Sequence, residues 1–106
     1  MELGHERLDV YKLALGVAVW AAQQAIPAQR KHLRDQLVRA ADSVVLNIAE
    51  GAGREPGDAR RNHFRIAAGS ASEVAAVLDL VALPGGPERQ QELRRVVAML
   101  YKLARR

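Results

Sequence analysis

Glu50 and Glu73 are the residues of this 106-residue chain whose type could support acid–base catalysis. Two carboxylates held close together can act as a general acid and a general base. No nucleophile, metal-binding motif or phosphate-binding loop accompanies them, so the other participants of such chemistry are missing. We therefore expect no enzyme, and we expect the two carboxylates to have a structural role or to contact a ligand or partner.

Polar residues also recur beside the apolar stripe of an expected helix. They are Arg39, Ser43, Asn47 and Glu50, spaced by four, four and three residues, which places them on one helix face. On the next helix, two polar residues interrupt an apolar row, namely Ser70 and Glu73. If that row is buried, Glu73 needs a partner, because an uncompensated buried carboxylate costs several kcal/mol or becomes protonated. Arg39 and Asn47 are the expected partners, and the six residues are predicted to form a polar network between helices or subunits.

The histidines do not have the spacing of a metal site. A di-iron helical bundle needs two Glu-x-x-His pairs on separate helices, and the chain has this spacing only at Glu2 and His5. His63 is expected at a helix surface or interface. The absence of cysteine excludes disulfides, cysteine-containing zinc sites and thiol catalysis. We expect no metal and no cofactor.

Basic side chains are concentrated near the C-terminus. Residues 88–106 carry six Arg or Lys against two Glu, an excess that equals the whole formal net charge of +4. A second cluster surrounds the start of the expected third helix. The candidates for nucleic-acid contact are Arg54, Arg60, Arg61, Arg65, Arg94, Arg95, Lys102 and Arg105. Alternatively, the C-terminal stripe is a solvated helix face whose cations suit the negative end of the helix dipole.

Composition and periodicity place these residues on helices. The chain is 49% hydrophobic but only 4% aromatic, so its core must consist mainly of Ala, Val and Leu, which pack well between helices. Apolar residues recur at helical spacing in four stretches. Helices are predicted over about 6–26, 29–50, 58–83 and 87–105. The predicted fold is a single domain over residues 1–106, an all-α, antiparallel, up-and-down four-helix bundle.

Helix-breaking residues separate the predicted helices. Pro27 should stop the first, because it lacks an amide donor. Gly51 and Gly53 should end the second by adopting the left-handed conformation. Asp58 should begin the third, and residues 84–87, Pro-Gly-Gly-Pro, should separate it from the fourth.

The first predicted helix is apolar over most of its circumference. A single bundle cannot cover that much apolar surface, which predicts contact with another subunit. Its longest apolar stretch, Leu13–Ala22, is ten residues long, about half of a membrane span. Residues 1–7 do not resemble a secretory signal, so a cytoplasmic location is expected.

The most distinctive parts of the sequence are AADSVVLNIAEG at residues 40–51 and FRIAAGSASE at residues 64–73. Together with residues 8–14 and 99–103, they resemble a family of bacterial four-helix-bundle proteins known from open reading frames in 23S ribosomal RNA intervening sequences. The resemblance covers nearly the whole chain. One departure is Val45, where the family usually has proline.

The resemblance implies a homopentamer of four-helix bundles with no enzymatic activity. Related proteins are accessory partners of reverse transcriptases in diversity-generating retroelements, where a basic surface is thought to engage nucleic acid or the enzyme. Two functions remain open for this chain. One is a sequence-independent module that binds RNA or DNA or accompanies a ribonucleoprotein, and the other is a scaffold whose basic surface binds an acidic protein partner.

Overall fold

The computed structural model describes residues 1–106 as four α-helices without a strand. The elements are α1 (Asp9–Ala22), a short 3-10 helix η1 (Ala28–Arg30), α2 (Lys31–Ala52), α3 (Asp58–Leu80) and α4 (Gly86–Ala104). The prediction of an all-α chain with four helices is confirmed.

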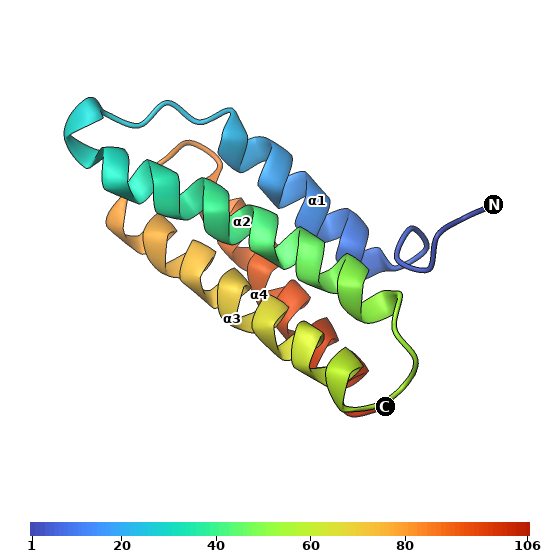
Figure 1. Cartoon of the computed structure of the whole chain (residues 1–106). Coiled ribbons are helices and arrows are strands. Elements are labelled where there is room, and N and C mark those ends of the chain that lie inside the picture. The colour runs from blue at the N-terminus through green and yellow to red at the C-terminus, as the bar shows by residue number, and fades with distance from the viewer.

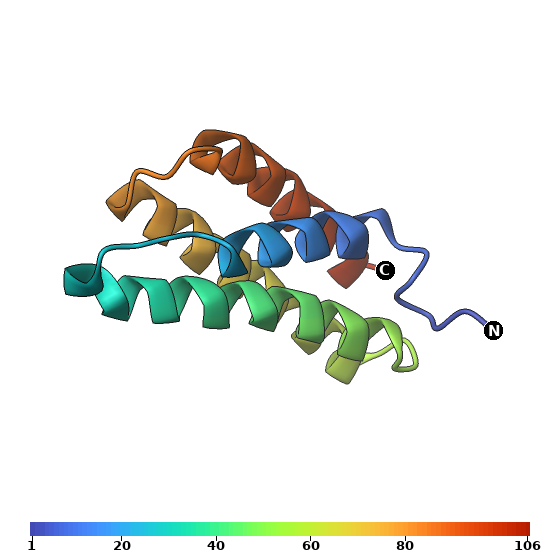
Figure 2. The same ribbon diagram turned by 90° about the horizontal axis from the view of Figure 1, so that it is seen from above.

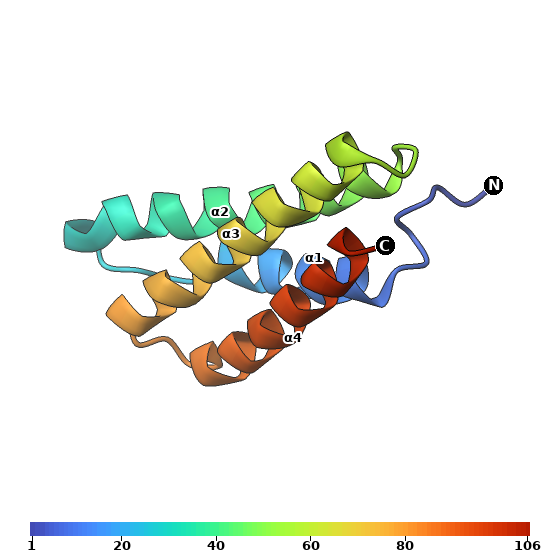
Figure 3. The ribbon, with the colours of Figure 1, turned by 90° about the horizontal axis from the view of Figure 1, so that it is seen from below.

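The four helices surround one core (Figure 1). Helices that follow one another in sequence pack together, and α1 also packs against α4. Figure 2 shows α1 between α2 and α4, and Figure 3 shows α3 between α2 and α4 on the other side of the bundle. The side formed by α1 and α2 is therefore opposite the side formed by α3 and α4.

The core consists of small and branched apolar side chains. It contains 23 buried hydrophobic residues and no buried polar or charged residue. Every helix contributes a fully buried side chain, for example Val17, Leu37, Phe64 and Leu100. Phe64 is the single aromatic residue among the buried ones, in agreement with the low aromatic content.

α1 is shorter at both ends than the predicted range 6–26. It ends at Ala22, where the prediction placed the end near Ile26. Ile26 precedes Pro27, and a residue before proline is biased towards extended backbone, so the chain leaves the helix before the proline is reached. None of the four helices has the combination of length and hydropathy that a membrane span requires.

α3 also ends earlier than predicted, at Leu80 and not near Leu83. The backbone becomes extended at Val81 (φ −126°, ψ 111°), and the side chain of Val81 is buried in the core. As predicted, residues 84–87 separate α3 from α4. Gly85 adopts the left-handed conformation (φ +82°), and Pro87 lies in the first turn of α4.

The glycines near the end of α2 have a different role from the predicted one. Gly51 lies inside α2 and Gly53 has a φ of −82°, so neither adopts the left-handed conformation. Gly51 instead lies directly against Phe64, where a Cβ atom would be only 2.7 Å from Cε1 of the ring. Glycine is needed here because α2 and α3 approach closely around that buried ring.

Candidate nucleic-acid interface

Four polar side chains meet between α2 and α3 in a hydrogen-bonded group that we call the Asn47 cluster: Ser43, Asn47, His63 and Ser70. Nδ2 of Asn47 donates to the carbonyl oxygen of Ser43 at 2.9 Å and to its Oγ at 3.2 Å. The Oγ atoms of Ser43 and Ser70 are 2.8 Å apart, and Oδ1 of Asn47 is 3.0 Å from Nδ1 of His63. Three of the six residues of the predicted polar network are therefore brought together.

The direction of each bond in the Asn47 cluster follows from its chemistry. Oδ1 of Asn47 can only accept, so Nδ1 of His63 carries a hydrogen and donates it. Oγ of Ser43 accepts from Asn47 and can donate its own hydrogen to Ser70. Neither serine is hydrogen-bonded to His63, so the cluster does not form a nucleophile–base pair. Two of its bonds, from Ser43 to Ser70 and from His63 to Asn47, cross between the helices and fix the register of α2 against α3.

The other three members of the predicted network lie outside this cluster. Glu50 is exposed and pairs with Arg54 at 3.5 Å. Arg39 and Glu73 are also exposed, and neither forms a hydrogen bond or an ion pair within the chain. Glu73 lies at an exposed position of α3, as does Ile66 of the same row, which is 43% exposed, so burial does not force the carboxylate to find a partner.

No group of three or more His, Asp or Glu side chains is placed to hold a metal ion. The two carboxylates considered for catalysis, Glu50 and Glu73, are both exposed, and the first is ion-paired. Neither carboxylate is therefore placed to act as a buried acid or base.

Three of the basic candidates are occupied by contacts within the chain. Arg54 pairs with Glu50, and Arg61 pairs with Asp58 in the first turn of α3. Arg60 donates to the carbonyl oxygen of Arg54 at 3.2 Å, and its guanidinium lies 5.5 Å from the centroid of the Phe64 ring. These arginines hold the connection between α2 and α3 in place.

The other five candidates are exposed and make no ion pair or hydrogen bond within the chain. We call this set the basic face: Arg65, Arg94, Arg95, Lys102 and Arg105. Three of the five lie on α4, Arg105 directly follows the last residue of α4, and Arg65 lies on the neighbouring α3. With no carboxylate attached to these side chains, they present their charge to the solvent or to a ligand.

Exposed apolar residues gather on the opposite side of the bundle. A shallow groove of about 380 Å³ runs between α1 and α2, and six of its seven lining residues are hydrophobic. Leu15, Val19 and Leu46 line it and are 41%, 51% and 63% exposed. The excess apolar surface that the sequence predicts for the first helix is therefore present, and it faces away from α3 and α4.

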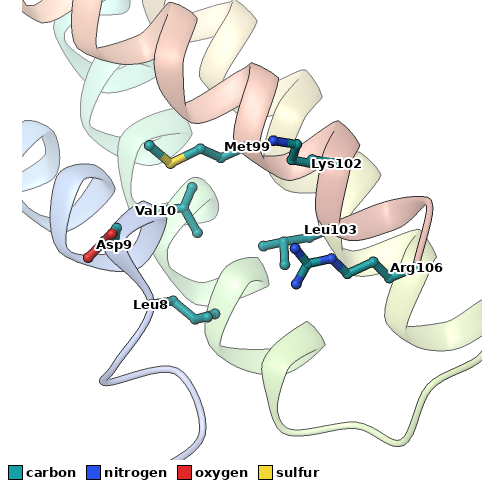
Figure 4. A pocket seen from close by; sticks show the side chains of 7 residues that line it. All are labelled: Leu8, Asp9, Val10, Met99, Lys102, Leu103 and Arg106. Atoms are coloured by element: carbon teal, nitrogen blue, oxygen red, sulfur yellow. The ribbon is translucent and has the colours of Figure 1, made fainter.

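A smaller pocket of about 170 Å³ lies between the start of α1 and the end of α4 (Figure 4). Its wall is apolar, and Leu8 and Leu103 contribute to it from the two helices. Lys102 and Arg106 stand along α4 on one side of it, and Asp9 lies on the α1 side (Figure 4). Lys102 lines this pocket and therefore lies on the side of α4 that faces α1. Arg94 lines a separate groove on the side of α4 that faces α3. The basic face therefore includes residues on both of these sides of α4.

Two residues were not given their role from the sequence: His63 was expected only at a helix surface or interface, and Tyr101 was not singled out. His63 is half-buried in the Asn47 cluster, and its spacing of seven from Ser70, which places both on one face of α3, could have indicated this. Tyr101 is 51% exposed on α4 between the arginines of the basic face. Its spacing of four from Arg105 and seven from Arg94 was the available signal.

These features define the chain as a small all-α bundle protein with a basic surface. Residues 6–102 match the model of a protein family described as 23S rRNA-intervening sequence protein. The match extends over almost the entire chain, and the chain therefore belongs to this family. No curated protein matches the sequence closely enough to be counted as a relative.

Proposed function

We propose that this protein is a non-enzymatic homo-oligomer of antiparallel, up-and-down four-helix bundles that binds nucleic acid through the basic face, without reading its sequence. The observation that carries the proposal is the set of five exposed, unpaired cations on α4, at its C-terminal end and on the neighbouring α3. Arginine and lysine bind phosphate by charge, and such contacts carry no sequence information.

The apolar groove between α1 and α2 supports the assembly part of this proposal. The apolar groove between these helices leaves Leu15, Val19 and Leu46 in contact with water, and a second copy could cover them. Subunits joined on that side would leave α4 free on each copy. The family resemblance favours five copies, and a cyclic arrangement would repeat the basic face around a ring of positive potential.

Fluorescence anisotropy with a labelled oligonucleotide tests the nucleic-acid assignment. Binding should be nearly independent of sequence and should weaken steeply with salt, because each phosphate contact releases counterions. If all five cations of one subunit engage a single strand, the logarithm of the affinity should fall with the logarithm of the salt concentration with a slope of about −3.5. Absence of binding at about 50 mM salt would favour the alternative, a scaffold whose basic face binds an acidic protein.

Light scattering on the purified protein tests the assembly. We expect a particle of several subunits at micromolar concentration, and a pentamer in particular. A stable monomer at that concentration would show that the α1–α2 groove is not a contact between copies. The two tests are independent, since a monomer could still bind nucleic acid through α4.

A further inference from the structure

Tyr101 is the one aromatic side chain that the fold leaves uncovered. Phe64 is fully buried, and Tyr11 and Trp20 are half-buried against the core. Tyr101 is 51% exposed and makes no hydrogen bond through its hydroxyl group. A single exposed apolar residue is common on protein surfaces, so exposure alone does not indicate a binding role for this ring.

Arginines of the basic face lie on both sides of Tyr101 along α4. Arg94 precedes it by seven residues and Arg105 follows it by four, so the three side chains share one helix face. The contacts of Arg94 show which way this face points, because Arg94 lines a groove together with Ser72 and Ala76 of α3. Tyr101 therefore lies on the α3 side of α4.

The direction of the two helices brings a third arginine to the same surface. Nε2 of Gln90, near the start of α4, donates to Oδ1 of Asp79 near the end of α3 at 2.7 Å. Arg94, four residues further along α4, lines a groove whose α3 residues reach back to Ala71 and Ser72. As residue numbers rise along α4 they fall along α3, so Tyr101 lies towards the half of α3 that carries Arg65.

Small exposed residues lie at the centre of α3 and along the groove that Arg94 lines. They are Gly69, Ser72 and Ala76. A Cβ atom added at Gly69 would meet no other atom within 4 Å, so the space directly beside Gly69 is open. Because Tyr101 is 51% exposed, a flat ligand can reach part of its ring from the solvent.

We propose that Tyr101 is a stacking platform for an unpaired base, and that the basic face therefore prefers single-stranded nucleic acid to a duplex. This inference rests on the nucleic-acid binding proposed above. Bases stack on aromatic side chains only when they are not already stacked inside a helix, so the ring offers nothing to a duplex. Arg65, Arg94 and Arg105 would neutralise the phosphates on both sides of the stacked base.

The test compares Tyr101→Leu, which keeps apolar bulk but removes the aromatic face, with Tyr101→Phe, which keeps the ring. The probes are a fluorescein-labelled mixed-sequence oligonucleotide and the same strand annealed to its complement. We expect Tyr101→Leu to lose about tenfold in affinity for the single strand and to change less than about twofold on the duplex. Tyr101→Phe should bind both probes like the unmodified protein.

The salt dependence separates stacking from charge. Stacking releases no counterions, so Tyr101→Leu should lower the affinity at every salt concentration without changing the slope. Arg94→Glu with Arg105→Glu should reduce the slope itself.

Other outcomes would overturn the inference in different ways. If the unmodified protein binds the single strand and Tyr101→Leu binds it equally well, the stacking role is wrong and the proposed function stands. If the unmodified protein binds neither probe at low salt, the proposed function fails and the stacking role fails with it. If Tyr101→Leu changes the particle mass in light scattering, Tyr101 is a contact between subunits.

Discussion

Replacing Gly51 by alanine should destabilise the fold, although alanine is the better helix former. The added Cβ atom would lie 2.7 Å from Cε1 and 2.9 Å from Cδ1 of Phe64, and 3.2 Å from Cβ of His63. Carbon atoms do not approach this closely without repulsion. Phe64 is 0% exposed and surrounded by core side chains, so its ring can move only if the neighbouring helices also move.

Two opposing contributions determine how much Gly51→Ala changes the free energy of unfolding. Forcing extra volume into a packed core costs about 1 to 3 kcal/mol. Alanine gains up to about 1 kcal/mol over glycine in a helix interior. Gly51→Ala should therefore lower the free energy of unfolding by up to about 2 kcal/mol.

Gly69→Ala is the matched control, because it makes the same chemical change in the middle of α3. Gly69 is exposed, and its added Cβ atom would meet nothing within 4 Å, so only the gain in helix propensity of about 1 kcal/mol remains. The two variants should differ by about 1 to 3 kcal/mol with opposite signs relative to the unmodified protein.

Urea unfolding followed by far-ultraviolet circular dichroism measures the difference. All samples need the same protein concentration, because association of subunits contributes to apparent stability. If Gly51→Ala is as stable as Gly69→Ala, then α2 does not approach the Phe64 ring as closely as the structure has it, and the role assigned to Gly51 is wrong.

Two further predictions concern the Asn47 cluster and the turn before α4. Ser43→Ala and Ser70→Ala each remove one partner of the same 2.8 Å hydrogen bond. Their effects on the free energy of unfolding should therefore be coupled by more than about 0.5 kcal/mol in a double-mutant cycle. Additive effects would contradict that bond. Gly85→Ala should lower the free energy of unfolding by about 1 to 2 kcal/mol, because Gly85 has a φ of +82° and a Cβ atom there would be 3.2 Å from Nε1 of Trp20. Thermal unfolding measures this loss. An unchanged midpoint temperature would show that the turn tolerates a side chain.

Periodicity was sufficient to predict the four helices, because their apolar stripes are long and separated by proline and glycine. The roles of single glycines were not predictable in the same way. A glycine that ends a helix and a glycine that admits a buried ring look alike in sequence. Gly51 belongs to the second kind because Phe64, which is remote in sequence, lies across from it.

Only part of the Asn47 cluster was predictable, because sequence spacing shows which residues share a helix face but not which neighbouring helix covers that face. The spacing of Ser43 and Asn47 places them on one face of α2, and Ser70 lies across from them on α3. The burial of a helix row, however, depends on which neighbour covers it, and within one chain nothing covers Glu73. The same limit applies to the basic residues, because only the fold shows that Arg61 is paired and Arg65 is not.

A pair of matched charge reversals tests most directly whether the unpaired cations of the basic face bind nucleic acid. Arg94→Glu with Arg105→Glu alters two members of the basic face, whereas Arg54→Glu with Arg61→Glu makes the same change in net charge at two arginines that are already ion-paired. Fluorescence anisotropy at low salt should show at least a tenfold loss of affinity for the first variant and a much smaller loss for the second. Equal losses would mean that only net charge matters, and no loss in either variant would contradict the assignment of the basic face as the binding surface.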